Sequence, residues 1–284
     1  MIRFIFITLL VLRSMSLLAT DAPQRIITLS GALTEVADAL GFGKNIVAVD
    51  VTSEFPAYVK QLPKVSRNRS LSVEGLMAYR PDIVLAPEGD ISKAIQSQLK
   101  AAGITLVNIK QEYSVKGALQ FIRTVAAALQ VPEKGQSLAL QTEKEVNAEL
   151  EKIRQAKRKT PGVLFIYARG AGAMSVAGKG SNMDALIQLA GGKNVVQEFS
   201  DFKPYSTEAM IRANPDAILL FDFGLSSLGG KNALLKMPGI TTTKAGKNKC
   251  VIEMDGPLLV NFSVRLATAI RELNRQLVQI TPQP

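Results

Sequence analysis

The chain has 284 residues, of which 47% are hydrophobic and 20% are charged, a balance typical of globular proteins and not of disordered ones. Its one cysteine, Cys250, excludes an intrachain disulfide, and the lack of histidine removes the commonest ligand of zinc and other transition metals. The net charge of +10 favours anionic partners. The basic residues are scattered apart from Lys152 to Lys159, which is most simply a solvated helix face. Because the N-terminal pattern described next predicts export, and an exported protein has little use for nucleic acid, we expect an acidic small molecule and no nucleic acid.

Residues 1–19 have the pattern of a secretory signal peptide. A short basic start ends at Arg3, and residues 4–18 are an apolar run that is too short for a comfortable membrane span. Ala19 and Ala22 are the candidates for the residue before the cleavage, and no cysteine follows that would carry a lipid anchor. The alternative is a buried first helix. We expect the mature chain to be exported and soluble.

Predicted strands and helices alternate through the first half of the chain. Apolar runs of strand length are separated by stretches with apolar residues at helical spacing. The expected strands are 25–29, 46–49, 82–86 and 104–107, and the expected helices are 33–40, a short one from 72, 91–102 and 114–129. Residues 52–69 are expected to form a loop with room for one turn of helix. This alternation predicts a mostly parallel sheet with helices on both faces.

Residues 133–158 are expected to form one long helix, because Ala, Leu, Glu, Gln and Lys dominate the stretch. It contains no proline, and no glycine after position 135. Such a helix spans about 39 Å at ~1.5 Å per residue. This length suits a rigid strut between an N-terminal lobe at 24–132 and a C-terminal lobe at 159–284. We therefore expect only small lobe movement when a ligand binds.

The second lobe shows the same alternation as the first. Its expected elements are strand 163–166, a glycine-rich loop at 167–180, helix 183–190, strands 217–221 and 251–255, and a closing helix at 266–276. The predicted fold class is therefore α/β, with two Rossmann-like lobes that contain parallel sheets and are joined by one long rigid helix.

One stretch of the chain occurs twice, at 71–86 and 205–220. The residues Ser, Glu, Pro and Asp of the first copy recur 134 positions later: Ser72, Glu74, Pro81 and Asp82 match Ser206, Glu208, Pro215 and Asp216. In each copy the serine is expected to cap a short helix and the glutamate to favour the positive end of its dipole. The Pro-Asp pair ends the helix before a buried strand. Two such copies predict two similar lobes.

A second shared segment shows where the lobes differ. Gly43-Lys44-Asn45 matches Gly192-Lys193-Asn194 at an offset of 149 positions, and in both copies a glycine ends an amphipathic helix. This offset is 15 residues larger than that of the first repeat, so the first lobe has about that much extra chain within 46–70. Extra length beside a repeated scaffold is where we expect function.

Ligands of open parallel sheets bind outside the carboxyl ends of the strands, which for two facing lobes is the cleft between them. Guanidinium groups suit planar carboxylates, and a phenol serves as a ligand or a stacking surface. For each arginine, a role as a loop charge that faces solvent is an equally good interpretation. For Tyr167, a position in the hydrophobic core is an equally good interpretation. The candidate ligand-binding residues are Ser30, Tyr58, Arg67, Arg69, Tyr167 and Arg169.

The sequence offers no catalytic constellation. Without histidine there is no Ser-His-Asp triad, and no pair of carboxylates stands out. Gly170-Ala-Gly172 does not continue into a dinucleotide fingerprint, because Ser175 occupies the third glycine position. The pattern indicates a binding protein and not an enzyme. Glu74 and Glu208, at one surface helix start per lobe, fit a symmetric partner with two basic sockets, or helix-dipole complementarity alone.

Over about residues 24–276 the chain resembles the periplasmic substrate-binding proteins of iron-complex and vitamin B12 ABC transporters, and among them most closely the haem-binding proteins. The segments that carry this resemblance are Leu71-Ser-Val-Glu-Gly-Leu, Gly170-Ala-Gly-Ala-Met-Ser-Val-Ala-Gly, Leu189-Ala-Gly-Gly-Lys-Asn, Phe202-Lys-Pro-Tyr-Ser-Thr-Glu and Met254-Asp-Gly-Pro-Leu-Leu. The resemblance implies capture of haem as a transported ligand, with no catalytic cofactor. It also implies the periplasm of a Gram-negative cell and an outer-membrane haem receptor system. Delivery to an inner-membrane ABC permease and its ATPase is implied as well, with Glu74 and Glu208 as the docking acids.

One departure from the family pattern concerns the iron ligand. Many haem-binding relatives have a tyrosine ligand just before the Leu-Ser-x-Glu-Gly motif, whereas Arg67 occupies that position here and Arg69 matches the pattern. A second-lobe histidine of some relatives is also missing. Tyr167 is then the candidate haem-iron ligand, with Tyr58, a methionine or no protein ligand as alternatives, and Arg67 is available for a propionate.

The alternative ligands of the same importer class are a ferric siderophore and a corrinoid. An exported enzyme or a sensor domain on the same scaffold is a more remote alternative. Direct capture of zinc or manganese is disfavoured, because such sites usually contain histidine.

Overall fold

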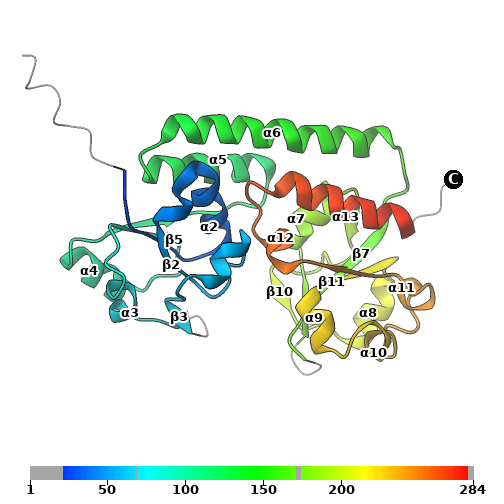
Figure 1. Ribbon diagram of the computed structural model, residues 1–284. Helices are drawn as coiled ribbons and strands as arrows, with labels where there is room; N and C mark the ends of the chain where they lie inside the picture. Colours follow the sequence, from blue (N-terminus) through cyan, green and yellow to red (C-terminus); the bar gives the residue numbers. More distant parts are fainter. Residues whose placement is uncertain (1–21, 68–69, 171–173, 281–284) are drawn as a thin grey trace, which may run out of the picture.

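The computed structural model describes residues 22–67, 70–170 and 174–280. In this part of the chain two lobes lie side by side, and one long helix, α6 (Pro132–Gln155), runs along the same side of both (Figure 1). The expected signal peptide at 1–19 lies outside the described residues. Within the described part, no helix is both long and apolar enough to cross a membrane.

The first lobe contains a sheet of four parallel strands in the order β2-β1-β5-β6. Its elements are β1 (Ile26–Thr28), α2 (Gly31–Ala37), η1 (Asp38–Phe42), η2 (Gly43–Asn45), β2 (Ile46–Val49), α3 (Val73–Met77), β5 (Ile83–Pro87), α4 (Lys93–Ala101), β6 (Thr105–Ile109) and α5 (Val115–Ala128). Neighbouring residues of a strand point to opposite faces. In β5, Ile83 and Leu85 therefore pack with α2 and α5, whereas Val84 and Ala86 pack with α3 and α4.

The second lobe contains a mixed sheet in the order β10-β8-β7-β11-β12, with β9 also paired to β7. Its elements are β7 (Gly162–Ala168), β8 (Met174–Ala177), α7 (Asn182–Leu189), β9 (Lys193–Asn194), β10 (Phe202–Lys203), α8 (Thr207–Ala213), β11 (Ala217–Phe221), α9 (Asp222–Ser227), α10 (Lys231–Leu235), α11 (Lys244–Lys247), β12 (Val251–Met254), α12 (Gly256–Val260) and α13 (Leu266–Ile280). The prediction of a loop throughout 167–180 was wrong, because β8 pairs antiparallel with β7. The two-lobed α/β fold is confirmed, with an antiparallel edge added to the second sheet.

The repeated stretch forms the same helix start in both lobes. The Ser72 hydroxyl accepts a hydrogen bond from the Gly75 N–H at 3.0 Å, and the Ser206 hydroxyl accepts one from the Ala209 N–H at 3.1 Å. Each serine satisfies a backbone donor that has no partner inside the helix. The two predicted caps are therefore confirmed.

The repeated helices also end alike. Arg80 and Asn214, which are 134 positions apart, have left-handed φ angles of 44° and 43°. The aspartates that follow, Asp82 and Asp216, accept hydrogen bonds from backbone N–H groups where the first strand of each lobe begins, at 2.9 and 2.8 Å. The two copies are thus the same structural unit from cap to strand.

Helix α6 packs on α5 of the first lobe and on α13 of the second. Gly135 allows the close approach to α5, because a side chain at this position would collide with Ala126. The long helix expected over 133–158 is found, but it ends at Gln155. Lys157 has a left-handed φ of 45° and turns the chain toward β7.

The extra chain of the first lobe, within 46–70, lies between β2 and α3. It contains the predicted turn of helix, η3 (Ala57–Gln61), and also a short hairpin formed by β3 (Ser66–Arg67) and β4 (Ser70–Leu71), which the sequence did not predict. The hairpin brings this extra chain to the carboxyl end of the first sheet.

Candidate functional site

Two cavities meet between the lobes, at the carboxyl ends of the central strands. Their volumes are about 740 Å³ and about 680 Å³, and both are lined by Tyr167, Phe221 and Val260 of the second lobe. The first lobe contributes Tyr113 to the larger cavity and Val51 to the other. We call these two cavities together the cleft.

Tyr167 lies where the two cavities meet. Its ring makes edge contacts with Phe221 and Phe223, each with ring centres 6.1 Å apart. The Nε–H of Arg169 donates to the Tyr167 hydroxyl oxygen at 2.5 Å, and the guanidinium carbon lies 5.1 Å from the Phe223 ring centre. The structure therefore holds a phenol oxygen in the cleft with a cation beside it and aromatic rings behind it.

A third cavity of about 560 Å³ lies on the first-lobe side and is lined in part by Ser30, Asp50, Thr52 and Ser66. Thr52 also lines the 680 Å³ cavity, so this space adjoins the cleft. The Ser30 hydroxyl caps α2 by accepting the Leu33 N–H at 3.2 Å. Ser30 therefore lines this cavity and also caps the start of α2.

The extra hairpin supplies part of this wall. Ser66 lines the third cavity, and the backbone of Arg67 follows it in β3. Arg69 lies outside the described residues. The hairpin is therefore near Ser30, while the roles of the two arginines stay predictions.

Tyr58 lies apart from the other candidates. It lines neither cavity of the cleft, and its hydroxyl donates to Asp38 Oδ1 of η1 at 2.7 Å. Burial, and then this hydrogen bond, raise the pKa of Tyr58 above its ordinary value. The hydroxyl is thus engaged within the first lobe, and the structure does not bring it to Tyr167.

Two residues of the larger cavity, Tyr113 and Lys179, were missed by the sequence reasoning. Tyr113 follows β6 by four positions, so the rule that ligands bind at the carboxyl ends of strands applies to it as well. Its ring makes an edge contact with Phe262, with ring centres 5.7 Å apart, and burial raises the pKa of its phenol. Lys179 follows β8, in the part that the sequence predicted as a loop.

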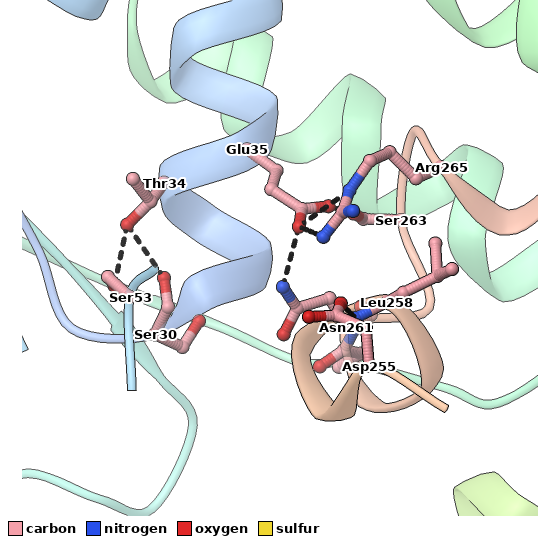
Figure 2. Close-up of polar contacts among 10 residues, drawn as sticks. Ser30, Thr34, Glu35, Ser53, Asp255, Leu258, Asn261, Ser263 and Arg265 are labelled. Atoms are coloured by element: carbon pink, nitrogen blue, oxygen red, sulfur yellow. Dashed lines mark hydrogen bonds and ion pairs between the residues drawn. The ribbon is translucent and has the colours of Figure 1, made fainter. Parts of the chain in front are cut away.

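A buried carboxylate joins the two lobes beside the cleft (Figure 2). Glu35 of α2 is only 2% exposed, and it accepts hydrogen bonds from Asn261 Nδ2 at 2.8 Å, Ser263 Oγ at 2.9 Å and Arg265 Nε at 2.9 Å. All three donors come from the segment between α12 and α13 of the second lobe. We call these four residues the interlobe clamp.

Neighbouring groups hold the interlobe clamp in place. The Phe55 ring centre lies 3.8 Å from the Arg265 guanidinium carbon, and Gln111 Nε2 donates to the Asn261 carbonyl at 2.6 Å. A Cβ at Gly31 would lie 2.8 Å from Asn261 Nδ2, so glycine is needed for this close approach. Since Val260 precedes Asn261 and lines both cavities, the clamp also fixes one wall of the cleft.

Glu74 and Glu208 lie in the first turns of α3 and α8 and are exposed to solvent. Both helices are on the side of the lobes away from α6 (Figure 1). Hydrogen bonds from its own backbone N–H and from the Ser206 side chain lower the pKa of Glu208. The two acids are therefore displayed on one side of the molecule, one from each lobe.

Comparison with known proteins identifies the family. The family model described as periplasmic binding protein matches residues 26–258. The periplasmic haem-binding protein RhuT from Roseiflexus sp. RS-1, solved in its apo form, is 36% identical, with a TM-score of 0.86 over 90% of this chain and 98% of its own. The haem-binding protein BhuT, solved with two haems, is 35% identical, with a TM-score of 0.85 over 90% and 98% of the two chains.

A curated relative by sequence has a different named ligand. The vitamin B12-binding protein of Vibrio campbellii is 29% identical over 218 residues, which are 74% of this chain and 75% of that protein. The resemblance expected from the sequence is thereby confirmed, and the similar proteins named above are binding proteins. This chain belongs to the periplasmic binding protein family, whose members serve ABC importers.

Proposed function

We propose that the protein is the exported solute-binding component of an ABC importer, that it captures haem in the cleft, and that it delivers haem to the inner-membrane permease and its ATPase. The family supports the importer role, and the similarity to RhuT and BhuT supports the ligand. The observation that carries the proposal is the position of Tyr167, whose oxygen lies in the cleft with Arg169 beside it.

This arrangement fits the chemistry of haem. A tyrosine oxygen is one of the axial ligands that proteins offer to haem iron. An iron-bound phenolate is negatively charged, and Arg169, which already donates to this oxygen, balances the charge. Phe221 and Phe223 offer apolar rings to the porphyrin. Lys179 is exposed at the larger cavity and suits a propionate.

The first lobe supplies the opposite wall. We propose that Arg67, in β3, and Arg69, two positions later in the sequence, pair with anionic groups of the ligand, because a guanidinium fork matches a carboxylate. On this proposal Ser30, at the start of α2, contacts the ligand from the first-lobe cavity that it lines. On this proposal the mature chain follows residues 1–19, and the lobes 24–132 and 159–284 close the ligand between them.

The cleft also has space for more than one ligand. Both of its cavities are lined by Tyr167, and BhuT was solved with two haems. We therefore expect a stoichiometry of one or two haems per chain, with the Tyr167 site filled first because it offers the iron a ligand.

A corrinoid is the second candidate, favoured by the similarity to the vitamin B12-binding protein of Vibrio campbellii. A corrinoid already holds its metal within the ring and does not need Tyr167 as a ligand. A ferric siderophore is a third ligand of the same importer class. An unchanged affinity after loss of the Tyr167 hydroxyl therefore points away from haem.

We further propose that Glu74 and Glu208 dock the loaded protein on the permease. They are exposed, occupy the same position in the two lobes and lie on one side of the molecule. A Gram-negative periplasm and an outer-membrane haem receptor, as the source of the ligand, complete this proposal.

The test is a titration of purified residues 20–284 with hemin, and separately with cyanocobalamin, followed by visible absorbance. The proposal predicts a saturable change of the hemin spectrum with one or two equivalents, and no saturable change with cyanocobalamin. Saturation by cyanocobalamin alone would replace haem by a corrinoid and leave the importer role in place.

A further inference from the structure

Two exposed apolar side chains occupy the same position in the two lobes. Met77 is 43% exposed and Ile211 is 44% exposed. They are 134 positions apart, which is the offset of the repeat, so Met77 of α3 corresponds to Ile211 of α8. The same position of the repeated unit is therefore apolar and exposed in both lobes.

Packing inside each lobe does not account for them. The preceding residues, Leu76 and Met210, also correspond, and both are buried in the cores of their lobes. Each helix therefore already contributes one side chain to its core. Met77 and Ile211 are turned outward, where burial by another molecule would remove apolar surface from water.

Each exposed side chain lies beside a docking acid. Met77 is three residues after Glu74, and Ile211 is three residues after Glu208. Residues three apart lie on the same face of a helix. Each lobe thus carries one carboxylate and one exposed apolar side chain on one short helix, and both helices, α3 and α8, lie on the side of the molecule away from α6 (Figure 1).

We propose that Met77 and Ile211 are apolar anchors for the permease, each inserting into an apolar hollow beside the cation that binds the neighbouring glutamate. This proposal rests on the docking role of Glu74 and Glu208. The two lobes each offer one glutamate and one apolar side chain in the same arrangement. A permease built of two like subunits has two equivalent surfaces, one for each of these pairs.

The charges and the anchors have separable effects. Charges at the rim of an interface mainly accelerate association and are weakened by salt, whereas buried apolar anchors mainly slow dissociation. Substitution by glutamine changes the polarity of an anchor and keeps a side chain that favours helix. Leu140 is the matched control, because it is 51% exposed and belongs to α6, a helix that lies on the other side of the molecule from α3 and α8.

The experiment measures binding of the mature protein to the permease–ATPase complex of its own importer in lipid nanodiscs. Met77→Gln and Ile211→Gln are each expected to weaken binding about tenfold, mainly through faster dissociation, at both low and high salt. Glu74→Gln and Glu208→Gln are expected to slow association at low salt. Leu140→Gln is expected to bind like the wild type.

Three results would overturn the inference. If the glutamate variants weaken binding and the Met77→Gln, Ile211→Gln double variant does not, the docking role stands and the anchors are refuted. If neither pair has an effect, the docking role fails together with the anchors. If the free protein self-associates and the double variant abolishes this, the anchors serve a second copy of the chain. An unchanged thermal unfolding midpoint and hemin titration show that each variant is folded.

Discussion

The interlobe clamp gives the sharpest prediction for stability. Glu35 is nearly inaccessible, with a side chain 1% exposed, and its ion-pair partner Arg265 is 20% exposed. Replacing Arg265 with leucine removes the charge partner and leaves a buried carboxylate with Asn261 and Ser263 as its donors. It also removes the guanidinium that lies over Phe55.

The size of the effect follows from these contacts. Breaking a buried ion pair by removing one partner typically costs about 3–5 kcal/mol. Because two neutral donors stay with Glu35 and Arg265 is partly exposed, we expect Arg265→Leu to lower the free energy of unfolding by about 2–4 kcal/mol. Replacing both partners by leucine is expected to cost less than the two single changes added together, because no charge is then left buried.

Urea unfolding followed by circular dichroism measures this free energy. The control is Arg271→Leu, since the Arg271 side chain is 49% exposed and its ion pairs with Glu149 and Glu272 are long, at 3.8 and 3.7 Å. Ion pairs of exposed side chains contribute about 0–1 kcal/mol. A loss below about 1 kcal/mol for Arg265→Leu, equal to that of the control, would refute the reasoning.

Three further predictions concern the caps, the pH dependence and the strut. Ser72→Ala and Ser206→Ala are each expected to cost about 1 kcal/mol of unfolding free energy in urea titrations, and no measurable loss would contradict the capping role. The pKa of Tyr58 is raised in the folded state, so the Tyr58 phenol adds to the free energy of unfolding at a pH below its ordinary pKa of 10.0. This stabilisation is lost as the pH rises from 10.0 through the higher pKa of the folded state. Tyr58→Phe should therefore flatten the alkaline decline of stability, and an unchanged decline would exclude this cause. Small-angle scattering with and without hemin should give nearly the same radius of gyration, because α6 resists bending; a marked contraction would contradict a rigid strut.

The parts of the fold that depend on local sequence could be predicted. Ser72 and Ser206 cap their helices because a hydroxyl at that position satisfies a free N–H, whatever surrounds it. The repeat then implied two lobes. The strand β8 was missed because its four residues follow several glycines, and only pairing with β7 makes the segment a strand.

Contacts between distant parts of the chain could not be predicted. Glu35 was not among the predicted site residues, because the donors that surround it are more than 220 positions away in the sequence and no local pattern indicates them. Tyr58 was an alternative to Tyr167 as the iron ligand in the sequence, but in the fold its hydroxyl donates to Asp38 and it lines neither cavity of the cleft. The hydrogen bond from Arg169 to the Tyr167 hydroxyl was not predicted, although both residues were candidates and lie two positions apart at the end of β7.

The most direct test of the central claim is the absorbance spectrum of the hemin complex of Tyr167→Phe, compared with the wild type and with Tyr58→Phe. Coordination of iron by Tyr167 predicts that the Tyr167→Phe complex loses the wild-type Soret and charge-transfer bands and binds hemin more weakly, while Tyr58→Phe is unchanged. Identical spectra and affinities for all three proteins would contradict haem capture through Tyr167.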